Sequence, residues 1–197
     1  YERSHWARTH IAFLRSFDGL VPFDMVWKGR EKRQVLDFRL VNGKVIVKGK
    51  INGGRAVDFA LDTGAEHTAL SERTARRYQI QTKLETLTAG VGEIGLRGLR
   101  IGKLRSLEIG SLTVSNLPCM IKTPSVRDLP TDQMDGFSPL ALGLSMTIDY
   151  RHKKLYIGEP LPDASLAKEM PLRYHRLPTV QGVVNGTPTS FIVDTGG

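Results

Sequence analysis

Two aspartates in this sequence are each followed by a threonine and a glycine. Asp62 opens the run Asp-Thr-Gly-Ala, and Asp194 opens the run Asp-Thr-Gly-Gly, 132 residues further along. Two carboxyl groups about 3 Å apart cannot both ionise comfortably, so they share one proton and titrate as a coupled pair. Such a pair could take a proton from water and donate one to an amide carbonyl. The fold would have to bring the two runs together.

The residues before each aspartate follow the same pattern. INGGRAVDFALDTGA and VNGTPTSFIVDTGG both place an Asn-Gly pair and an apolar run ahead of Asp-Thr-Gly. Asn-Gly accepts the positive φ angles of a type I′ turn, so each segment is predicted to be a β-hairpin that delivers the chain to its aspartate. A single Asp-Thr-Gly would be a weak signal, because Asp and Gly are common turn residues. The repetition indicates a duplicated lobe whose second copy breaks off just after its signature.

The rest of the chain has the composition of an antiparallel all-β domain. From residue 21 onward, short runs of Val, Ile, Leu and Phe alternate with Gly, Asn and Pro. Residues 71–80 predict a short amphipathic helix. Five glycines within residues 84–103 argue against a helix there and favour a mobile hairpin or loop. Strands are expected over residues 104–121, and a further hairpin is expected to run through Ile148 and Leu155.

The predicted organisation has four parts. Residues 1–20 are a short helix or an N-terminal arm, and residues 21–160 are the first lobe. Residues 161–171, which are rich in proline, are a linker. Residues 172–197 are the first hairpin of a second, similar lobe.

Composition excludes several other classes of protein. The net charge of +8 is spread along the chain without the interleaved aromatic residues of a nucleic-acid stacking surface, so a solvated basic face is the better interpretation. Cys119 is the only cysteine, so no disulfide forms within the chain. The five histidines lack metal-ligand spacing. No run approaches the roughly 18 apolar residues of a membrane helix, and no signal peptide is visible, although Tyr1 in place of Met suggests a processed chain.

The stretch ALDTGAEHTALS resembles the active-site loop of retropepsin- and pepsin-type aspartic peptidases. The wider pattern over residues 20–160, including VPFDMV and DGFSPLALGLSMTIDY, resembles bacterial retropepsin-like proteins, and FIVDTGG resembles a second copy of the loop. The resemblance implies an all-β, barrel-like lobe with short helices, followed by the start of a second lobe. It also implies hydrolysis of peptide bonds in a protein or peptide substrate, with no metal or cofactor, in a periplasmic or exported bacterial protein.

Carried over residue by residue, the resemblance assigns the catalytic carboxylates to Asp62 and Asp194. In the family the threonine hydroxyls hydrogen-bond across the two loops, and the glycines leave room for their close approach. The other residues assigned to the active-site loops are Thr63, Gly64, Ala65, Thr195 and Gly196. A glycine-rich flap that closes over substrate corresponds to Ala89, Gly90, Val91 and Gly92, without the tyrosine that is characteristic of pepsin flaps.

One further assignment stays open at the level of the sequence. The apolar pair and glycine that support the catalytic loop in the family could be Leu142-Gly143 or the residues around Gly136. Glu66 and His67 are predicted to lie in a solvated turn. Asp135 and Asp149 are interpreted as structural.

Three functional hypotheses follow. The first is an aspartic endopeptidase that pairs Asp62 with Asp194 in one chain, with a variant in which a homodimer pairs Asp62 of two chains. The second is a non-catalytic β-domain that binds peptides or partner proteins. The third is a nucleic-acid-binding domain, which only the charge favours.

Overall fold

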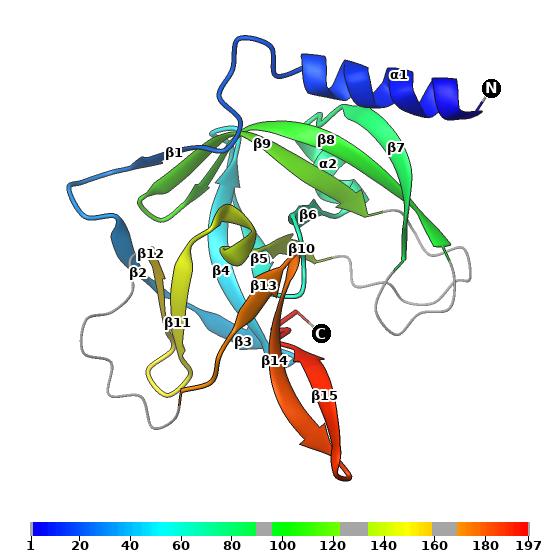
Figure 1. The fold of residues 1–197 in the computed structure, drawn as a ribbon. Helices are drawn as coiled ribbons and strands as arrows, with labels where there is room; N and C mark the ends of the chain where they lie inside the picture. The colour runs from blue at the N-terminus through cyan, green and yellow to red at the C-terminus, as the bar shows by residue number, and fades with distance from the viewer. Residues whose placement is uncertain (1, 90–95, 123–133, 159–168, 197) are drawn as a thin grey trace. The chain divides into compact units, whose positions relative to one another are not determined.

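The computed structural model describes residues 2–89, 96–122, 134–158 and 169–196 (Figure 1). These residues form fifteen strands, two α-helices and one short 3-10 helix. Nine strands belong to one sheet, ordered β1-β9-β6-β10-β5-β4-β8-β7 with β3 beside β4, and an additional pairing of β8 with β9 closes six of them into a ring. The predicted all-β class and barrel-like lobe are therefore confirmed.

The chain divides into two compact units that share the strands β4, β5 and β10. One unit contains residues 1–28, 48–58 and 68–135, and the other contains residues 29–47, 59–67 and 136–197. The sequence-based division into a lobe, a linker and a second hairpin stays a prediction, and most of the predicted linker, up to residue 168, lies outside the described residues.

In the first unit, a curved antiparallel layer of long strands forms the core (Figure 1). β8 pairs with β7 on one side and with β9 on the other, and β9 also pairs with β1 and, in parallel, with β6. The elements of this unit are α1 (Glu2–Arg15), β1 (Asp24–Trp27), β6 (Thr68–Leu70), α2 (Glu72–Arg77), β7 (Thr82–Ala89), β8 (Leu96–Ile109) and β9 (Leu112–Lys122). The fully buried side chains include Leu70, Leu104, Leu107, Ile109, Leu112, Leu117 and Ile121.

The second unit contains two three-stranded sheets in addition to its parts of the large one. Their orders are β11-β12-β2 and β13-β14-β15, and all pairings are antiparallel. The elements are β2 (Arg33–Asp37), β3 (Arg39–Val41), η1 (Leu140–Leu142), β11 (Ser145–Asp149), β12 (Lys154–Gly158), β13 (Arg173–His175), β14 (Leu177–Val184) and β15 (Thr187–Ile192). The strands divided between the units are β4 (Lys44–Ile51), β5 (Ala56–Leu61) and β10 (Asp135–Phe137).

Most local predictions are confirmed. Residues 1–20 contain the helix α1, and residues 71–80 contain α2. The glycine-rich region forms the antiparallel pair β7–β8, although residues 90–95 at its tip lie outside the described part of the chain. Ile148 pairs with Leu155 in the predicted hairpin.

Asp135 is structural, as the sequence suggested, and it holds the start of α2. Its Oδ1 accepts the backbone N–H of Ser71 at 2.7 Å, and its Oδ2 accepts the Thr74 hydroxyl at 2.7 Å. Ser71 also caps the helix directly, because its Oγ accepts the backbone N–H of Thr74 at 3.1 Å. This buried cap fixes α2 next to β6, the strand that follows the first Asp-Thr-Gly.

The cap predicts a pH dependence of stability. Burial raises the pKa of Asp135 above its usual value, while hydrogen bonds from Ser71 and Thr74 act in the opposite direction. A raised folded-state pKa contributes stability below the unfolded value of about 3.9, and that contribution is lost as pH rises through the folded-state pKa. The stability advantage of the wild type over Asp135→Asn should therefore shrink from acidic to neutral pH in urea unfolding. An advantage that grows with pH would contradict this assignment.

Candidate active site

Two hairpins lead into the two Asp-Thr-Gly loops, and both loops belong to the second unit. β4 and β5 are joined by residues 52–55, in which Asn52 and Gly53 have φ angles of 52° and 73°, and β5 ends just before Asp62. β14 and β15 are joined by Asn185 and Gly186, with φ angles of 50° and 81°, and Asp194 follows shortly after β15. Both turns have the paired positive φ angles that the Asn-Gly signals predict. The internal repeat in the sequence is therefore also a repeat in local structure.

The threonines of the two loops hydrogen-bond to each other reciprocally. The backbone N–H of Thr195 donates to Thr63 Oγ1 at 3.1 Å, and the backbone N–H of Thr63 donates to Thr195 Oγ1 at 3.3 Å. Each hydroxyl then donates to the strand that leads into the opposite loop. Thr63 Oγ1 donates to the Val193 carbonyl at 2.5 Å, and Thr195 Oγ1 donates to the Leu61 carbonyl at 2.8 Å. Four hydrogen bonds thus join two loops that are 132 residues apart in the sequence.

The glycines of the loops lie against the opposing carboxyl groups. A Cβ atom added to Gly64 would lie 2.5 Å from Cγ of Asp194, and one added to Gly196 would lie 2.4 Å from Cγ of Asp62. Neither glycine has a positive φ angle, so the requirement is for space rather than for a left-handed backbone. Each carboxyl group therefore packs against the glycine of the opposite loop.

The two aspartates differ in their surroundings. Asp62 is half-buried, and its backbone N–H donates to the carbonyl of Phe137 in β10 at 2.9 Å. Asp194 is exposed, and its Oδ1 accepts the backbone N–H of Gly196 at 2.7 Å. Thr63 between the two loops is buried, with 1% of its surface exposed. The two loops are held together at the threonines by hydrogen bonds, whereas Asp194 is open to solvent.

The threonine contacts predict a specific loss of stability. Thr63→Val keeps the shape of the side chain but leaves the Thr195 N–H and the Val193 carbonyl without their partner. An unsatisfied buried group costs about 1–3 kcal/mol, so the free energy of unfolding in urea should fall by about that amount. Thr63→Ser, which keeps the hydroxyl and removes one methyl group, should lose about 1 kcal/mol. Equal losses in the two variants would contradict a role for the hydroxyl.

An ion pair links the first loop to the segment before the second hairpin. Arg176 Nη2 lies 2.8 Å from Glu66 Oε2, and Arg176 has a φ angle of 66°, which is unusual for a residue with a side chain. Burial lowers the pKa of the adjacent His67; Glu66 acts against this effect and Arg176 adds to it. The Arg176 side chain is largely exposed, so this pair contributes about 1 kcal/mol or less.

Sequence reasoning missed the partners of the first loop. Glu66 and His67 were expected in a solvated turn, whereas Glu66 pairs with Arg176 and His67 is half-buried. Arg176 carried no motif or periodicity that could have identified it. Of the two supporting segments left open, the one after Gly136 contributes the Phe137 carbonyl next to Asp62, while Leu142-Gly143 ends the helix η1.

Two other predictions have different outcomes. Asp149 is structural, since its carboxylate accepts the backbone N–H of His152 at 2.9 Å and contacts the His152 ring in the turn before β12. In the predicted flap, Ala89 ends β7, but Gly90, Val91 and Gly92 lie outside the described residues. The flap assignment therefore stays a prediction.

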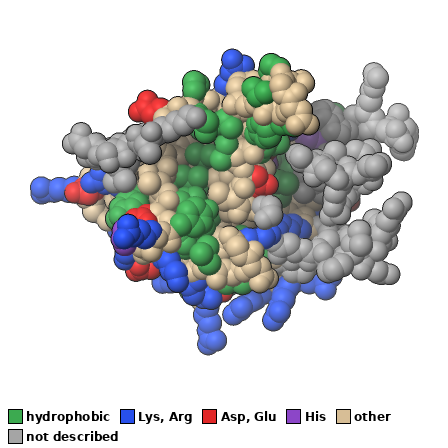
Figure 2. Space-filling view, turned by 90° about the horizontal axis from the view of Figure 1, so that it is seen from below, with side chains coloured by type: hydrophobic (Ala, Val, Ile, Leu, Met, Phe, Trp, Pro, Cys, Tyr) green, Lys and Arg blue, Asp and Glu red, His purple; other side chains and the backbone are tan. Residues whose placement is uncertain are grey.

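The two hairpins differ sharply in burial. Val45, Ile46 and Phe59 of the first hairpin have 2% or less of their surface exposed. Val183 and Phe191 of the second hairpin are 66% and 41% exposed. Figure 2 shows apolar side chains on the surface of the face that it presents. The same local motif is a core element in one copy and a surface element in the other.

Comparisons with known proteins identify a family for part of this chain. The family described as gag-polyprotein putative aspartyl protease matches residues 47–145, which include the first Asp-Thr-Gly and not the second. No curated protein matches the chain. In the described residues, no helix is long and apolar enough to cross a membrane.

Two solved structures are similar to this chain. A retropepsin-like aspartic protease from Rickettsia conorii has 15% sequence identity and a TM-score of 0.45, over 70% of this chain and 94% of its own. The retroviral protease-like domain of Ddi1 from Leishmania major has 19% identity and a TM-score of 0.38, over 62% of this chain and 98% of its own. The match to the family spans half of the chain and includes the β4–β5 hairpin, Asp62 and the glycine-rich strands. This chain belongs to the family of retropepsin-like aspartic proteases.

Proposed function

We propose that this protein is an aspartic endopeptidase in which Asp62 and Asp194 of one chain form the catalytic pair. The observation that carries the proposal is the reciprocal bonding of Thr63 and Thr195, with each aspartate packed on the glycine of the opposite loop. Catalytic carboxyl groups must be held within a fraction of an ångström of their working positions. The four cross-loop hydrogen bonds supply that restraint.

The reaction needs one ionised and one protonated carboxyl group. The ionised carboxyl takes a proton from a water molecule as its oxygen attacks the peptide carbonyl carbon. The protonated carboxyl gives its proton to the carbonyl oxygen, which forms a tetrahedral diol. The first carboxyl then gives the proton it took from water to the amide nitrogen as the C–N bond breaks, and a diol hydroxyl returns a proton to the second carboxyl. The proposal therefore requires that the two carboxyl groups share one proton. The mechanism uses no metal, cofactor or covalent intermediate.

The substrate in this proposal is a protein or peptide bound in extended form, covered by the flap at Ala89, Gly90, Val91 and Gly92. Pairing of Asp62 with Asp194 makes one chain sufficient for catalysis, whereas the homodimeric variant would pair Asp62 of two chains. We also propose that the protein is exported from the cytoplasm of a bacterium. This part of the proposal rests on the family resemblance alone.

Cleavage of an unfolded protein tests the proposal. Wild-type protein and Asp62→Asn would be incubated with reduced, denatured casein from acidic to neutral pH, with a metal chelator present. We expect cleavage by the wild type, unaffected by the chelator, and none by the variant. Cleavage that the variant retains would exclude Asp62 as a catalytic residue.

A non-catalytic peptide-binding domain is the alternative. The exposed apolar side chains of the β14–β15 hairpin favour this reading, because exposed apolar patches often mark interaction sites. Under the alternative, both proteins would bind extended peptides and neither would cleave them. Peptide binding without turnover by correctly folded wild type would therefore replace the peptidase proposal.

A further inference from the structure

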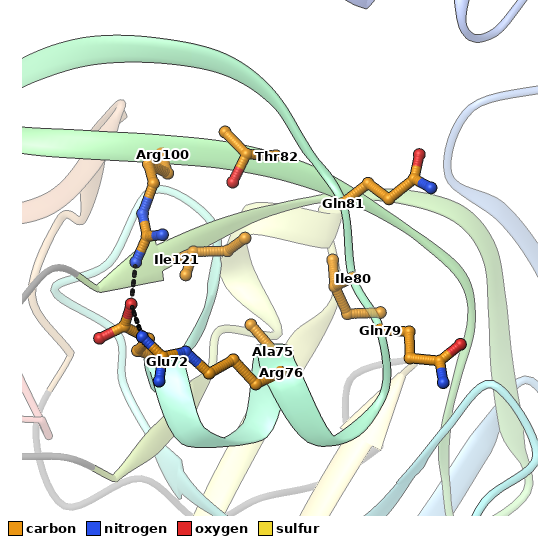
Figure 3. A pocket seen from close by; sticks show the side chains of 9 residues that line it. All are labelled: Glu72, Ala75, Arg76, Gln79, Ile80, Gln81, Thr82, Arg100 and Ile121. Atoms are coloured by element: carbon orange, nitrogen blue, oxygen red, sulfur yellow. Dashed lines mark hydrogen bonds and ion pairs between the residues drawn. The ribbon is translucent and has the colours of Figure 1, made fainter.

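A small cavity in the first unit lies between α2, the segment that follows it, and the strands β8 and β9 (Figure 3). Its volume is about 280 Å³, and its apolar lining is Ala75, Ile80 and Ile121. Small-molecule sites usually occupy about 300–1,000 Å³. The cavity is therefore large enough for one side chain but too small to enclose a cofactor.

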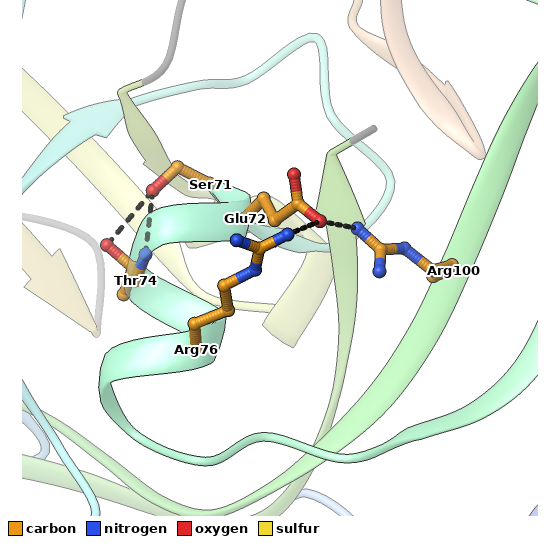
Figure 4. Close-up of polar contacts among 5 residues, drawn as sticks. All are labelled: Ser71, Glu72, Thr74, Arg76 and Arg100. Carbon is orange, nitrogen blue, oxygen red and sulfur yellow. Dashed lines mark hydrogen bonds and ion pairs between the residues drawn. The ribbon is translucent and has the colours of Figure 1, made fainter. Parts of the chain in front are cut away.

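Two arginines at the cavity share one carboxylate oxygen. Arg76 Nη2 and Arg100 Nη2 lie 3.0 Å and 2.9 Å from the same Oε1 of Glu72 (Figure 4). Arg76 is largely exposed, and in the described structure the Nε of Arg100 is buried without a hydrogen-bond partner. One carboxylate thus faces two guanidinium groups, each of which carries five N–H donors. Glu72 cannot accept all of these N–H groups, so N–H donors of the two arginines remain for a ligand.

A shallower depression next to the cavity adds to the positive charge. It is lined by Glu72, Arg73, Arg76 and Arg77, so it shares Glu72 and Arg76 with the cavity. Arg73 and Arg77 are exposed. Among the described residues, the cavity and the depression together contain four arginines and one glutamate. A ligand with several carboxylates complements this charge, because arginine binds carboxylates through two parallel hydrogen bonds.

The lining distinguishes among anionic ligands. Single-stranded nucleic acids bind where aromatic side chains stack on the bases, and none of the lining residues in the described part of the chain is aromatic. The apolar residues are aliphatic or small, which suits an aliphatic side chain. Gln79 and Thr82 at the cavity supply polar groups that could bond to a peptide backbone.

We propose that the cavity and the α2 arginines, hereafter the α2 groove, bind an acidic peptide segment. One aliphatic side chain of the segment enters the cavity beside Ile80 and Ile121, and its flanking carboxylates pair with Arg73, Arg76 and Arg77. The groove shares no residue with the two Asp-Thr-Gly loops, so binding does not depend on the proposed peptidase activity.

Fluorescence anisotropy tests the proposal with a fluorescein-labelled peptide in which glutamates flank one leucine. The protein would carry Asp62→Asn to prevent cleavage of the probe, and ionic strength would be fixed near physiological. We expect saturable binding that weakens about tenfold in the double variant Arg73→Gln, Arg77→Gln, since two solvent-exposed ion pairs are lost and each contributes about threefold. Thr82→Phe, which places a ring at the cavity, should weaken binding of the leucine peptide and not of its glycine analogue.

The matched control removes the same charge elsewhere in the unit. Lys50 and Arg105 are exposed and line neither the cavity nor the depression, so Lys50→Gln with Arg105→Gln should leave binding within about twofold. The proposal fails if folded protein does not bind the acidic peptide below about 1 mM. It also fails if the control loses as much affinity as the groove variant, or if an oligothymidine probe binds the groove more tightly than the peptide.

Discussion

Asp194→Asn should lose as much activity as Asp62→Asn. Each removes one of two carboxyls whose loops are joined by four hydrogen bonds, and an amide neither accepts a proton from water nor donates one as an acid. General acid–base groups contribute about 10²–10⁴-fold each, so kcat/KM for a peptide substrate should fall by about 10³-fold or more in either variant. Circular dichroism should show an unchanged fold, because asparagine keeps the oxygen that accepts the Gly196 N–H.

The double variant gives the sharper control. Residues that act as one unit have non-additive effects on catalysis. The protein with both substitutions should therefore be no less active than either single variant. Multiplicative losses would indicate that the two aspartates act separately, and full activity of Asp194→Asn would remove Asp194 from the catalytic pair.

Gly64→Ala and Gly196→Ala should have the second-largest effect. The added methyl group would lie 2.5 Å or less from the Cγ of the opposing aspartate, so either the carboxyl or the loop must move. A displacement of about 1 Å at a catalytic group can cost roughly 100-fold in rate. We expect kcat to fall by about that factor in each variant, with a smaller change in KM, in steady-state peptide cleavage.

Gly182→Ala in β14 is the matched control. There the added methyl group meets the ring of Phe191, which is exposed and free to rotate away. This variant should keep activity within about twofold, since surface substitutions rarely have large effects. Equal activity losses in Gly182→Ala and Gly64→Ala would mean that alanine harms the hairpins in general rather than the carboxyl pair.

The sequence predicted those parts of the fold that depend on local chemistry. Asn52-Gly53 and Asn185-Gly186 mark both hairpins because few other residue pairs accept two successive positive φ angles. Residues 71–80 were predicted to contain a helix because apolar residues recur there at helical spacing among charged ones, and α2 forms over Glu72–Arg77. Such signals lie within a few residues of the structure they determine.

Features that depend on distant residues were not predictable. The partners of Asp135 at the start of α2 lie 61 and 64 residues away. Arg176 reaches Glu66 across 110 residues. The contrast between buried Phe59 and exposed Phe191 could not be read from two similar apolar runs, because burial depends on which elements pack against each hairpin.

In the candidate site, too, the sequence predicted what depends on local residues and not what depends on distant ones. The Asp-Thr-Gly repeat identified Asp62 and Asp194 as a pair, and the two loops do lie together in the structure. The sequence could not give the reason that both loops need glycine. That reason is the opposing carboxyl group, which occupies the place of a side chain.

A mixing experiment tests most directly whether one chain supplies both catalytic carboxyls. Asp62→Asn and Asp194→Asn proteins would be unfolded together in urea, refolded at equal concentrations, and assayed for peptide cleavage beside each variant alone. With Asp62 and Asp194 paired within one chain, both variants are inactive and their mixture stays inactive. Activity that returns on mixing, or an Asp194→Asn protein that is active alone, would show that the catalytic carboxyls come from two chains.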